Sequence, residues 1–499
     1  MSTATIGPAE ATPGAEPMTR AQIRVLVIGI MFALALAAFD QTVIVTALPT
    51  IAADLGSAEK LSWVVTAYLL TSTATAPLYG KFSDSHGRRT ALLLAMGLFV
   101  AGSVACALAP SMTALVVARG LQGIGAGGLI AIPMTVIGDI IPPRERGRYQ
   151  AYIAGVYASA SLGGPVIGGS LAEYFHWTLI FWMNIPIAAV AFAVAGPAMR
   201  RLTVKRQARR IDLLGAILLV AATSMLLLAL TWAGNLFGWM SATTIGLLAA
   251  ATVASGLFAF RVTTAVEPII PVGVLANPVV AAGVAASFFA MGAFVGLTMA
   301  IPLYFELVRG LSASEAGIAV IPYMIGTTFG AMASGRIMGR TGRYKKPPLV
   351  GLSIAIVSLA VISMTFERLP DVPLALSLAL VTLGLGTVLP VSTVAVQNAV
   401  ARDDMGTATA LNTFCRQLGG AFVVAVFGAI LVAGGAGNAV LARGDPGAVD
   451  PALGAAFAWI FIGAAASLAA AMVAILLIED RPLRGADDPR HASPATDGT

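Results

Sequence analysis

The sequence predicts an all-α integral membrane protein, and three observations lead to this fold class. Hydrophobic residues make up 58% of the 499 residues and charged residues only 11%, against about 25% charged residues in an average soluble protein. The apolar residues form long blocks. Basic residues gather in every second connection between these blocks, and two sequence patterns recur in the second half of the chain.

A helix that crosses a bilayer core of about 30 Å needs roughly 20 apolar residues. With this window the sequence predicts fourteen transmembrane helices. They lie near residues 25–48, 61–80, 91–110, 113–138, 149–171, 177–197, 213–233, 242–261, 279–303, 314–337, 348–366, 372–396, 407–434 and 455–478.

The basic residues predict the topology of these helices. The first and last flanks and the even-numbered loops, which include the run at 199–210, hold 24 Lys and Arg, against 4 in the odd-numbered loops. Arg119 and Arg416 lie within spans and complete the total of 30. Positive charge stays on the cytoplasmic side, so we expect both termini there. The net charge of +6 therefore reflects topology, and we expect no nucleic-acid partner.

Two recurring patterns predict an internal duplication. "GKFSDSHGRRT" (80–90) resembles "GRIMGRTGRYK" (335–345), and "RERGRYQAY" (144–152) resembles "DDMGTATAL" (403–411), at offsets of 255 (335 − 80) and 259 (403 − 144) residues. The helices near 213–261 have no counterpart, which predicts six plus two plus six helices. Repeated halves around a site near the bilayer midplane are typical of secondary transporters.

These observations predict five segments. They are a cytoplasmic N-terminal tail (1–20), a six-helix bundle (21–200), a cytoplasmic linker with two inserted helices (201–265), a second six-helix bundle (266–480) and a cytoplasmic C-terminal tail (481–499).

Two charged residues lie inside predicted spans of the N-terminal half. Asp40 interrupts the apolar run "AAFDQTVIVTALP" (37–49), and Arg119 lies a turn or two into the fourth span. A charge at such depth costs several kcal/mol and needs a partner. Asp40 lies about 23 Å along its helix from Val25, a depth compatible with Arg119, so we expect the two to pair.

Asp40 is therefore our candidate for the protonation site. A nearby Arg119 favours the ionised carboxylate, whereas desolvation favours the protonated form when the two separate. A carboxylate that alternates between these environments takes up protons on one side of the membrane and releases them on the other. The alternative interpretation is a permanent structural ion pair.

Several motifs together resemble a known family. They are "FDQTVIVTALP" (39–49), "GKFSDSHGRR" (80–89), "ARGLQGIGAGG" (118–128), "GGPVIGG" (163–169) and "NTFCRQLGG" (412–420). The chain is similar in these motifs to major facilitator superfamily transporters of the fourteen-helix drug:proton antiporter branch, which export drugs. The resemblance implies the major facilitator fold and the proton gradient as energy source, without a cofactor.

The resemblance also assigns roles to two motifs. It implies a gate at Gly80, Asp84, Gly87, Arg88 and Arg89 that locks the cytoplasmic side in the outward-facing state. Asp84 can accept hydrogen bonds at a helix N-terminus or pair with an arginine across the two halves; the basic residues of this loop also fix topology. The second motif, antiporter-like and expected at the interface of the halves, consists of Gly164, Pro165, Gly168 and Gly169.

Further polar residues are candidates for the substrate cavity or for hydrogen bonds between helices. We name Gln41, Gln122, Asn412 and Arg416 for the cavity. Some antiporters of the resembled branch carry further carboxylates deep in the tenth and thirteenth spans, and their absence here disfavours a strong preference for dications. The three histidines are scattered, so we expect no metal site, and "GIGAGG" (123–128) follows no strand, so it is not a dinucleotide loop.

The predicted function is proton-coupled efflux of small lipophilic drugs or toxic compounds across the bacterial inner membrane. We expect a monomer surrounded by membrane lipid, and we expect no enzymatic activity and no catalytic residues. The alternatives are export of an endogenous amphiphile, such as a lipid, siderophore or secondary metabolite, and a non-transporting membrane receptor. Proton-coupled uptake is disfavoured by the antiporter-like motif.

Overall fold

The computed structural model describes residues 19–57, 60–200, 212–235, 237–435 and 451–479, and within these ranges every regular element is helical. The predicted tails and the basic linker lie almost wholly outside the described residues. The elements are α1 (Arg20–Leu55), α2 (Leu61–His86), α3 (Arg88–Ala107), α4 (Met112–Ile140), α5 (Pro143–Tyr174), α6 (Leu179–Trp182), α7 (Asn184–Met199), α8 (Leu213–Asn235), α9 (Ala242–Thr264), α10 (Val272–Leu275), α11 (Pro278–Leu307), α12 (Ala313–Thr341), α13 (Lys346–Thr365), α14 (Asp371–Gly386), α15 (Val388–Ala399), η2 (Arg402–Asp404), α16 (Met405–Ala433) and α18 (Pro451–Leu477).

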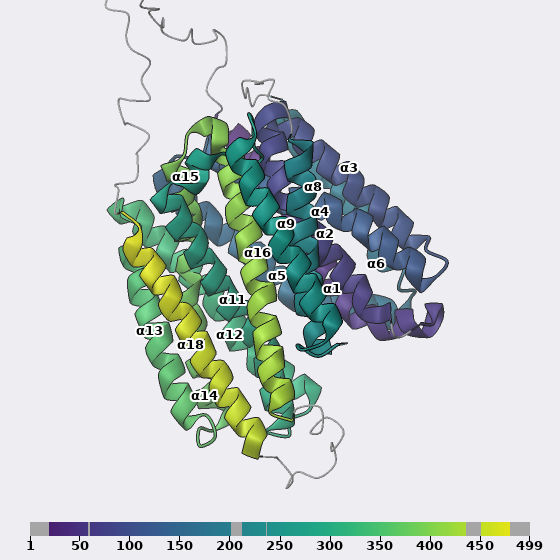
Figure 1. Cartoon of the computed structure of the whole chain (residues 1–499), viewed down its shortest axis with the longest axis vertical. Helices are drawn as coiled ribbons and strands as arrows, with labels where there is room; N and C mark the ends of the chain where they lie inside the picture. Colours follow the sequence, from purple (N-terminus) through teal and green to yellow (C-terminus); the bar gives the residue numbers. More distant parts are fainter. Residues whose placement is uncertain (1–18, 58–59, 201–211, 236, 436–450, 480–499) are drawn as a thin grey trace, which may run out of the picture.

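The long helices lie side by side along the long axis of the molecule (Figure 1). In the N-terminal half α4 packs against α2 and α3, and α1 packs against α5 and α7. In the C-terminal half α11 packs against α16 and α18, and α12 against α14. The hairpin of α8 and α9 stands beside both halves, because α8 contacts α2 and α16. The segment boundaries given from the sequence stay predictions.

Twelve helical segments in the described chain are long and apolar enough to cross a membrane, with α6–α7 and α14–α15 each counted as one. The difference from the expected fourteen comes from α2 and α5, of 26 and 32 residues. Both carry polar residues on the side that packs inside the bundle. Examples are Ser72, Thr73 and Asp84 on α2, and Arg146 and Gln150 on α5, all buried. Length and apolarity therefore support twelve crossings.

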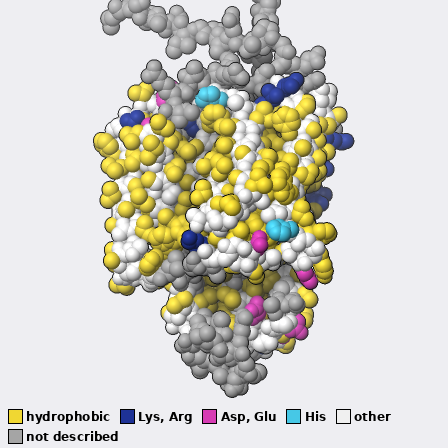
Figure 2. Space-filling view, turned by 90° about the vertical axis from the view of Figure 1, so that its right-hand side faces the viewer, with side chains coloured by type: hydrophobic (Ala, Val, Ile, Leu, Met, Phe, Trp, Pro, Cys, Tyr) yellow, Lys and Arg dark blue, Asp and Glu magenta, His cyan; other side chains and the backbone are white. Residues whose placement is uncertain are grey.

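The exterior of the bundle is apolar. Figure 2 shows hydrophobic side chains over the middle of one face and charged side chains mainly toward its margins. Large apolar residues such as Val253, Phe260 and Val357 are more than 60% exposed, at 63%, 68% and 62%. An apolar surface of this extent is suited to lipid. The structure is thus that of a multi-pass membrane protein.

The connections predicted at 80–90 and 335–345 are mostly helical, which corrects the sequence interpretation. Helix α2 continues to His86, and only Gly87, with a φ of +91°, separates it from α3. Helix α12 likewise continues to Thr341. The end of α2 is buried, with Asp84 in contact with the other half, whereas the last turns of α12 carry the exposed residues Arg336 and Arg340.

The glycine-rich run at 123–128 packs α4 closely against its neighbours. A Cβ atom on Gly125 would lie 2.4 Å from the backbone nitrogen of Phe99, and one on Gly123 would lie 2.5 Å from the carbonyl oxygen of Tyr68. Small residues let the backbones of membrane helices approach this closely. The run therefore serves helix packing and forms no nucleotide-binding loop.

Replacing Gly125 by leucine should destabilise the protein by about 3 kcal/mol or more, because the new side chain overlaps the backbone of α3. Gly97→Leu is the matched control, because Gly97 lies on α3 beside open space. The measurement is the apparent Tm of purified protein in detergent. A similar fall in both variants would contradict this account of the α3–α4 contact.

Candidate functional site

A buried carboxylate lies inside the N-terminal half. Asp40 on α1 is 2% exposed and accepts hydrogen bonds from two other helices. From α4, Arg119 Nη1 donates to Oδ2 at 2.6 Å and Gln122 Nε2 donates to Oδ1 at 2.8 Å. From α7, Asn184 Nδ2 donates to Oδ1 at 2.8 Å. The structure thus brings together the two residues that helix depth led us to pair.

The guanidinium of Arg119 is enclosed as completely as its partner. Arg119 is 1% exposed. Its Nη1 also donates to Gln122 Oε1 at 2.6 Å, its Nε donates to the carbonyl oxygen of Val64 at 3.2 Å, and the group lies 4.2 Å from the ring centroid of Tyr68. Excellent geometry and added hydrogen bonds are what a buried ion pair needs to offset its desolvation.

Sequence reasoning misses two residues of this cluster, Ser103 on α3 and Tyr68 on α2. Ser103 Oγ accepts hydrogen bonds from Asn184 at 3.0 Å and from Gln122 at 3.3 Å, and it donates to the carbonyl oxygen of Phe181 at 2.8 Å. A single serine or tyrosine within an apolar span gives no distinctive sequence signal. Asn184 is the further member that the sequence does indicate, as a polar residue within a predicted span.

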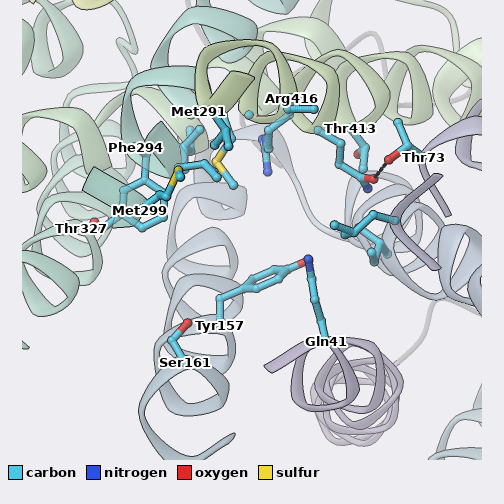
Figure 3. A pocket seen from close by; sticks show the side chains of 18 of the residues that line it. Gln41, Thr73, Tyr157, Ser161, Met291, Phe294, Met299, Thr327, Thr413 and Arg416 are labelled. Atoms are coloured by element: carbon cyan, nitrogen blue, oxygen red, sulfur yellow. Dashed lines mark hydrogen bonds between the residues drawn. The ribbon is translucent and has the colours of Figure 1, made fainter. Parts of the chain in front are cut away.

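A cavity of about 750 Å³ lies between the two halves. Its wall comes from α1, α2, α4 and α5, from α11, α12, α15 and α16, and from the inserted helix α8 through Leu227, Leu230 and Thr231. Figure 3 shows Met291 and Phe294 on one side of it. Ligand pockets of roughly 300–1,000 Å³ hold drug-sized molecules. The cavity is therefore of suitable size for a small amphiphile.

Two of the four predicted cavity residues line the cavity, Gln41 and Arg416. The other two do not, which corrects the expectation. Gln122 is 0% exposed because it bonds to the Asp40 carboxylate. Asn412 is 0% exposed and donates to Thr393 Oγ1 at 3.3 Å, behind the cavity wall. Both polar side chains join helices by hydrogen bonds instead.

One end of the bundle, upper in Figure 1, is where α2 and α12 end and α5 and α16 begin; we call it the basic end. Here the halves meet through glycines. A Cβ atom on Gly80 would lie 2.7 Å from the carbonyl oxygen of Gly406, and one on Gly147 would lie 2.8 Å from the Cα of Gly335. These four glycines belong to the four segments of the internal repeat.

Asp84 adds hydrogen bonds to the first of these contacts, between α2 and α16. Its Oδ1 accepts a hydrogen bond from the backbone N–H of Gly406 at 2.9 Å. Its Oδ2 accepts from the backbone N–H of Thr407 at 2.8 Å and from the Thr407 hydroxyl at 2.7 Å. These donors form the N-terminus of α16, where the helix dipole favours negative charge. Asp84 therefore binds a helix N-terminus across the halves, the first of the two alternatives.

The two arginines of the predicted gate differ. Arg88 is 2% exposed, pairs with Asp84 on its own half and donates through Nε to Asp139 Oδ2 at 2.8 Å. Arg89 donates to the carbonyl oxygen of Gly196 at 3.4 Å, within the N-terminal half. Arg88 thus supports the contact between the halves through Asp84, whereas this bond of Arg89 stays within one half.

The antiporter-like motif packs α5 against α1. A Cβ atom on Gly164 would lie 2.1 Å from Thr42 Oγ1, and one on Gly168 would lie 2.1 Å from the backbone of α1. Gly169 faces open space, and Pro165 lies inside the continuous helix α5. Gly164 and Gly168 therefore contact α1 within one half, while helix α5 itself also packs against α12 of the other half. Helix α5 meets the other half near its N-terminus.

The site consists of a buried ion pair and an apolar cavity. The described residues contain no group of three or more His, Cys, Asp and Glu side chains able to hold a metal ion. The Asp40 carboxylate is held by partners from α4 and α7, and the cavity has room for an apolar molecule next to Gln41, the following residue in the chain.

The sequence matches known transporters. A family model described as Major Facilitator Superfamily matches residues 30–424. The chain is 35% identical over 428 residues to an uncharacterized MFS-type transporter of Mycobacterium tuberculosis, Rv1877; this covers 86% of the chain and only 62% of the relative's length. It is 32% identical over 410 residues to the multidrug transporter protein MdtP of Bacillus subtilis, covering 81% of the chain and 75% of that protein.

Solved structures share the fold. The crystal structure of the human organic anion transporter MFSD10 (TETRAN) matches with a TM-score of 0.63 and 15% identity, covering 91% of this chain and 99% of that one. The proton:xylose symporter XylE matches with a TM-score of 0.62 and 17% identity, covering 93% and 98%. At these identities the likeness shows the fold alone.

Replacing Arg119 by methionine should lower the stability by about 3 kcal/mol or more, because it leaves the Asp40 carboxylate buried without its charged partner. The double variant with Asp40→Asn should recover most of the loss, since it removes the uncompensated charge. The apparent Tm of the wild type, both single variants and the double variant forms a complete cycle. Additive losses would contradict a direct charge pair.

Proposed function

Since the chain belongs to the Major Facilitator Superfamily, we propose that it exports small lipophilic compounds in exchange for protons, as a member of the fourteen-helix drug:proton antiporter branch. The family and the fold are those of a transporter and not of an enzyme. Relatives named as multidrug or efflux transporters support export. The observation that carries the proposal is the buried Asp40–Arg119 pair beside an apolar cavity between the halves.

Asp40 is the proton site in this mechanism. In the described state Arg119 Nη1 lies 2.6 Å from the Asp40 carboxylate and pairs with it. When rearrangement of the halves withdraws Arg119, the same carboxylate lies in apolar surroundings and binds a proton. Gln41, the residue after Asp40 on α1, lines the cavity. A movement of α1 therefore changes the surroundings of Asp40 and the substrate contact of Gln41 together, which couples proton binding to transport.

Alternating access is supported by the difference between the two ends of the bundle, one closed and the other approached by the cavity. We assign the basic end to the cytoplasmic side of a bacterial inner membrane, with both termini on that side. Asp84 and the glycine contacts seal this end, while the cavity extends past mid-bundle to Leu307 and Leu431 near the opposite end. The structure then corresponds to an outward-facing state.

The proposed branch has fourteen crossings. Helices α2 and α5 pack against crossing helices, and with these two helices also crossing the membrane the number of crossings is fourteen.

The transporter would act as a monomer in lipid, with the proton gradient in place of a bound cofactor and without a nucleic-acid partner. The apolar cavity is also compatible with export of an endogenous amphiphile, the second candidate. The connection from Leu307 to Ala313 is short, which leaves little structure to guide a lipid. A receptor would have no use for a protonatable pair beside the cavity.

Asp40→Asn should abolish proton coupling while the protein stays folded, because an amide does not exchange a proton. The measurement uses liposomes that contain a pH-sensitive dye and purified protein, with a panel of lipophilic compounds added under an imposed proton gradient. Asp54→Asn is the matched control, since Asp54 is a half-exposed carboxylate on the same helix. If the Asp40 variant releases as many protons as the wild type when substrate is added, Asp40 is not the proton site.

Asp84→Asn should favour opening of the basic end, because it removes charge-assisted hydrogen bonds to α16. Spin labels at His86 and Ala401, both exposed at this end, report the separation of α2 and α16. We expect the wide-separation population to rise roughly ten-fold relative to the closed one, equivalent to about 1.4 kcal/mol. Glu145→Gln, an exposed carboxylate at the same end, is the control. An unchanged distance distribution between the two spin labels would contradict a gating role for Asp84.

A further inference from the structure

We propose that the cavity binds amphiphilic organic anions and that Arg416 binds their charged group. The inference rests on the proposed export function and names the charge class of its substrate. It starts from an imbalance in the wall of the cavity: among the described residues that line it, Arg416 carries a charge and none is Asp or Glu.

Arg416 lacks the partners that the other buried arginine of the membrane interior possesses. Arg119 has a carboxylate at 2.6 Å and two further acceptors. Arg416, only 9% exposed, donates from Nη2 to the Thr393 hydroxyl at 2.9 Å, and its Nε is buried without any hydrogen-bond partner. An arginine stays charged in proteins. The protein therefore holds a cation in an apolar wall with one neutral acceptor.

The other unsatisfied groups of the cavity wall point to the same ligand chemistry. Gln150 Nε2 and Thr327 Oγ1 are buried, line the cavity and have no hydrogen-bond partner among the described residues. An amide nitrogen only donates, and a hydroxyl can donate. Together with Arg416 these residues place hydrogen-bond donors in the cavity wall, and none of the three carries an ionised acceptor. A ligand that satisfies them carries acceptor oxygens, and a negative charge satisfies Arg416 best.

The other side chains of the cavity wall determine which apolar part of a ligand fits. Figure 3 shows the guanidinium of Arg416 and the hydroxyl end of Tyr157 directed into the same space, with Met291, Phe294 and Met299 at its side. Aromatic and thioether side chains pack against flat or irregular apolar groups. A volume of about 750 Å³ accommodates a molecule of drug size with one anionic group. A lipophilic dication, in contrast, would meet a cation and no carboxylate.

The experiment compares three fluorescent ligands with one body and three charges: dansylglycine, an anion; dansylglycinamide, which is neutral; and dansylcadaverine, a cation. Equilibrium binding is measured with the purified full chain in detergent. The variants are Arg416→Met, which keeps length and removes charge, and Arg416→Lys, which keeps charge. Arg336→Met is the matched control, because Arg336 is exposed and does not line the cavity.

We expect the wild type and the Arg336 variant to bind dansylglycine at least ten-fold more tightly than the other two ligands. Arg416→Met should lose this preference while its affinity for dansylglycinamide stays within about two-fold, and Arg416→Lys should retain part of it. The apparent Tm of Arg416→Met should equal or exceed that of the wild type, because the variant removes a buried, poorly paired charge. This result separates lost binding from lost folding.

The inference is overturned if the wild type shows no preference for the anion, including no binding of dansylglycine, or if Arg416→Met keeps the preference. Its failure is distinguishable from failure of the proposed function. Anion binding that depends on Arg416, without proton-coupled transport in liposomes, would refute export and leave the inference standing. If export is coupled through Asp40 but depends neither on Arg416 nor on ligand charge, the proposed export function stands and the inference about anions is refuted.

Discussion

A charge buried in an apolar bundle must find a partner, and this constraint organises the N-terminal half. Asp40 draws Arg119 and Gln122 from α4 and Asn184 from α7, and Ser103 on α3 completes the set. Four helices are thereby fixed around one carboxylate. A pair satisfied so fully costs little to keep, and it is disrupted only by a movement large enough to separate the helices.

The two halves of the chain treat buried arginine differently. Around Arg119 in the N-terminal half the chain supplies a carboxylate and two further acceptors, and the group is 1% exposed, so it is closed to ligands. In the C-terminal half Arg416 has one hydroxyl as its partner and borders the cavity, so completion of its hydrogen bonds is left to a molecule from outside. The inserted helix α8, which has no counterpart in the repeat, contributes to the same wall through Leu230.

The sequence predicted the long helices and the Asp40–Arg119 pair well, because apolar length and helix depth are properties of single segments. It predicted less well where tertiary contacts decide. Gln122 and Asn412 looked suited to a cavity, yet both are used between helices, and nothing in one sequence tells which face of a membrane helix meets a neighbour. The connection at 80–90 looked like a loop because it is polar, whereas its polarity serves burial between the halves. Ser103 gave no signal at all.

The glycine contacts at the basic end arise from one duplicated pattern, but they are unequal in strength. Asp84 adds three hydrogen bonds from a helix N-terminus to the contact of α2 with α16. The position that corresponds to Asp84 in the repeat is Gly339 (84 + 255), so the contact of α5 with α12 has no such carboxylate. In the proposed mechanism, separation of α2 from α16 must break these three hydrogen bonds, and separation of α5 from α12 breaks no such set. A single acidic residue, present in only one of two similar sequence segments, thus makes two similar glycine contacts unequal.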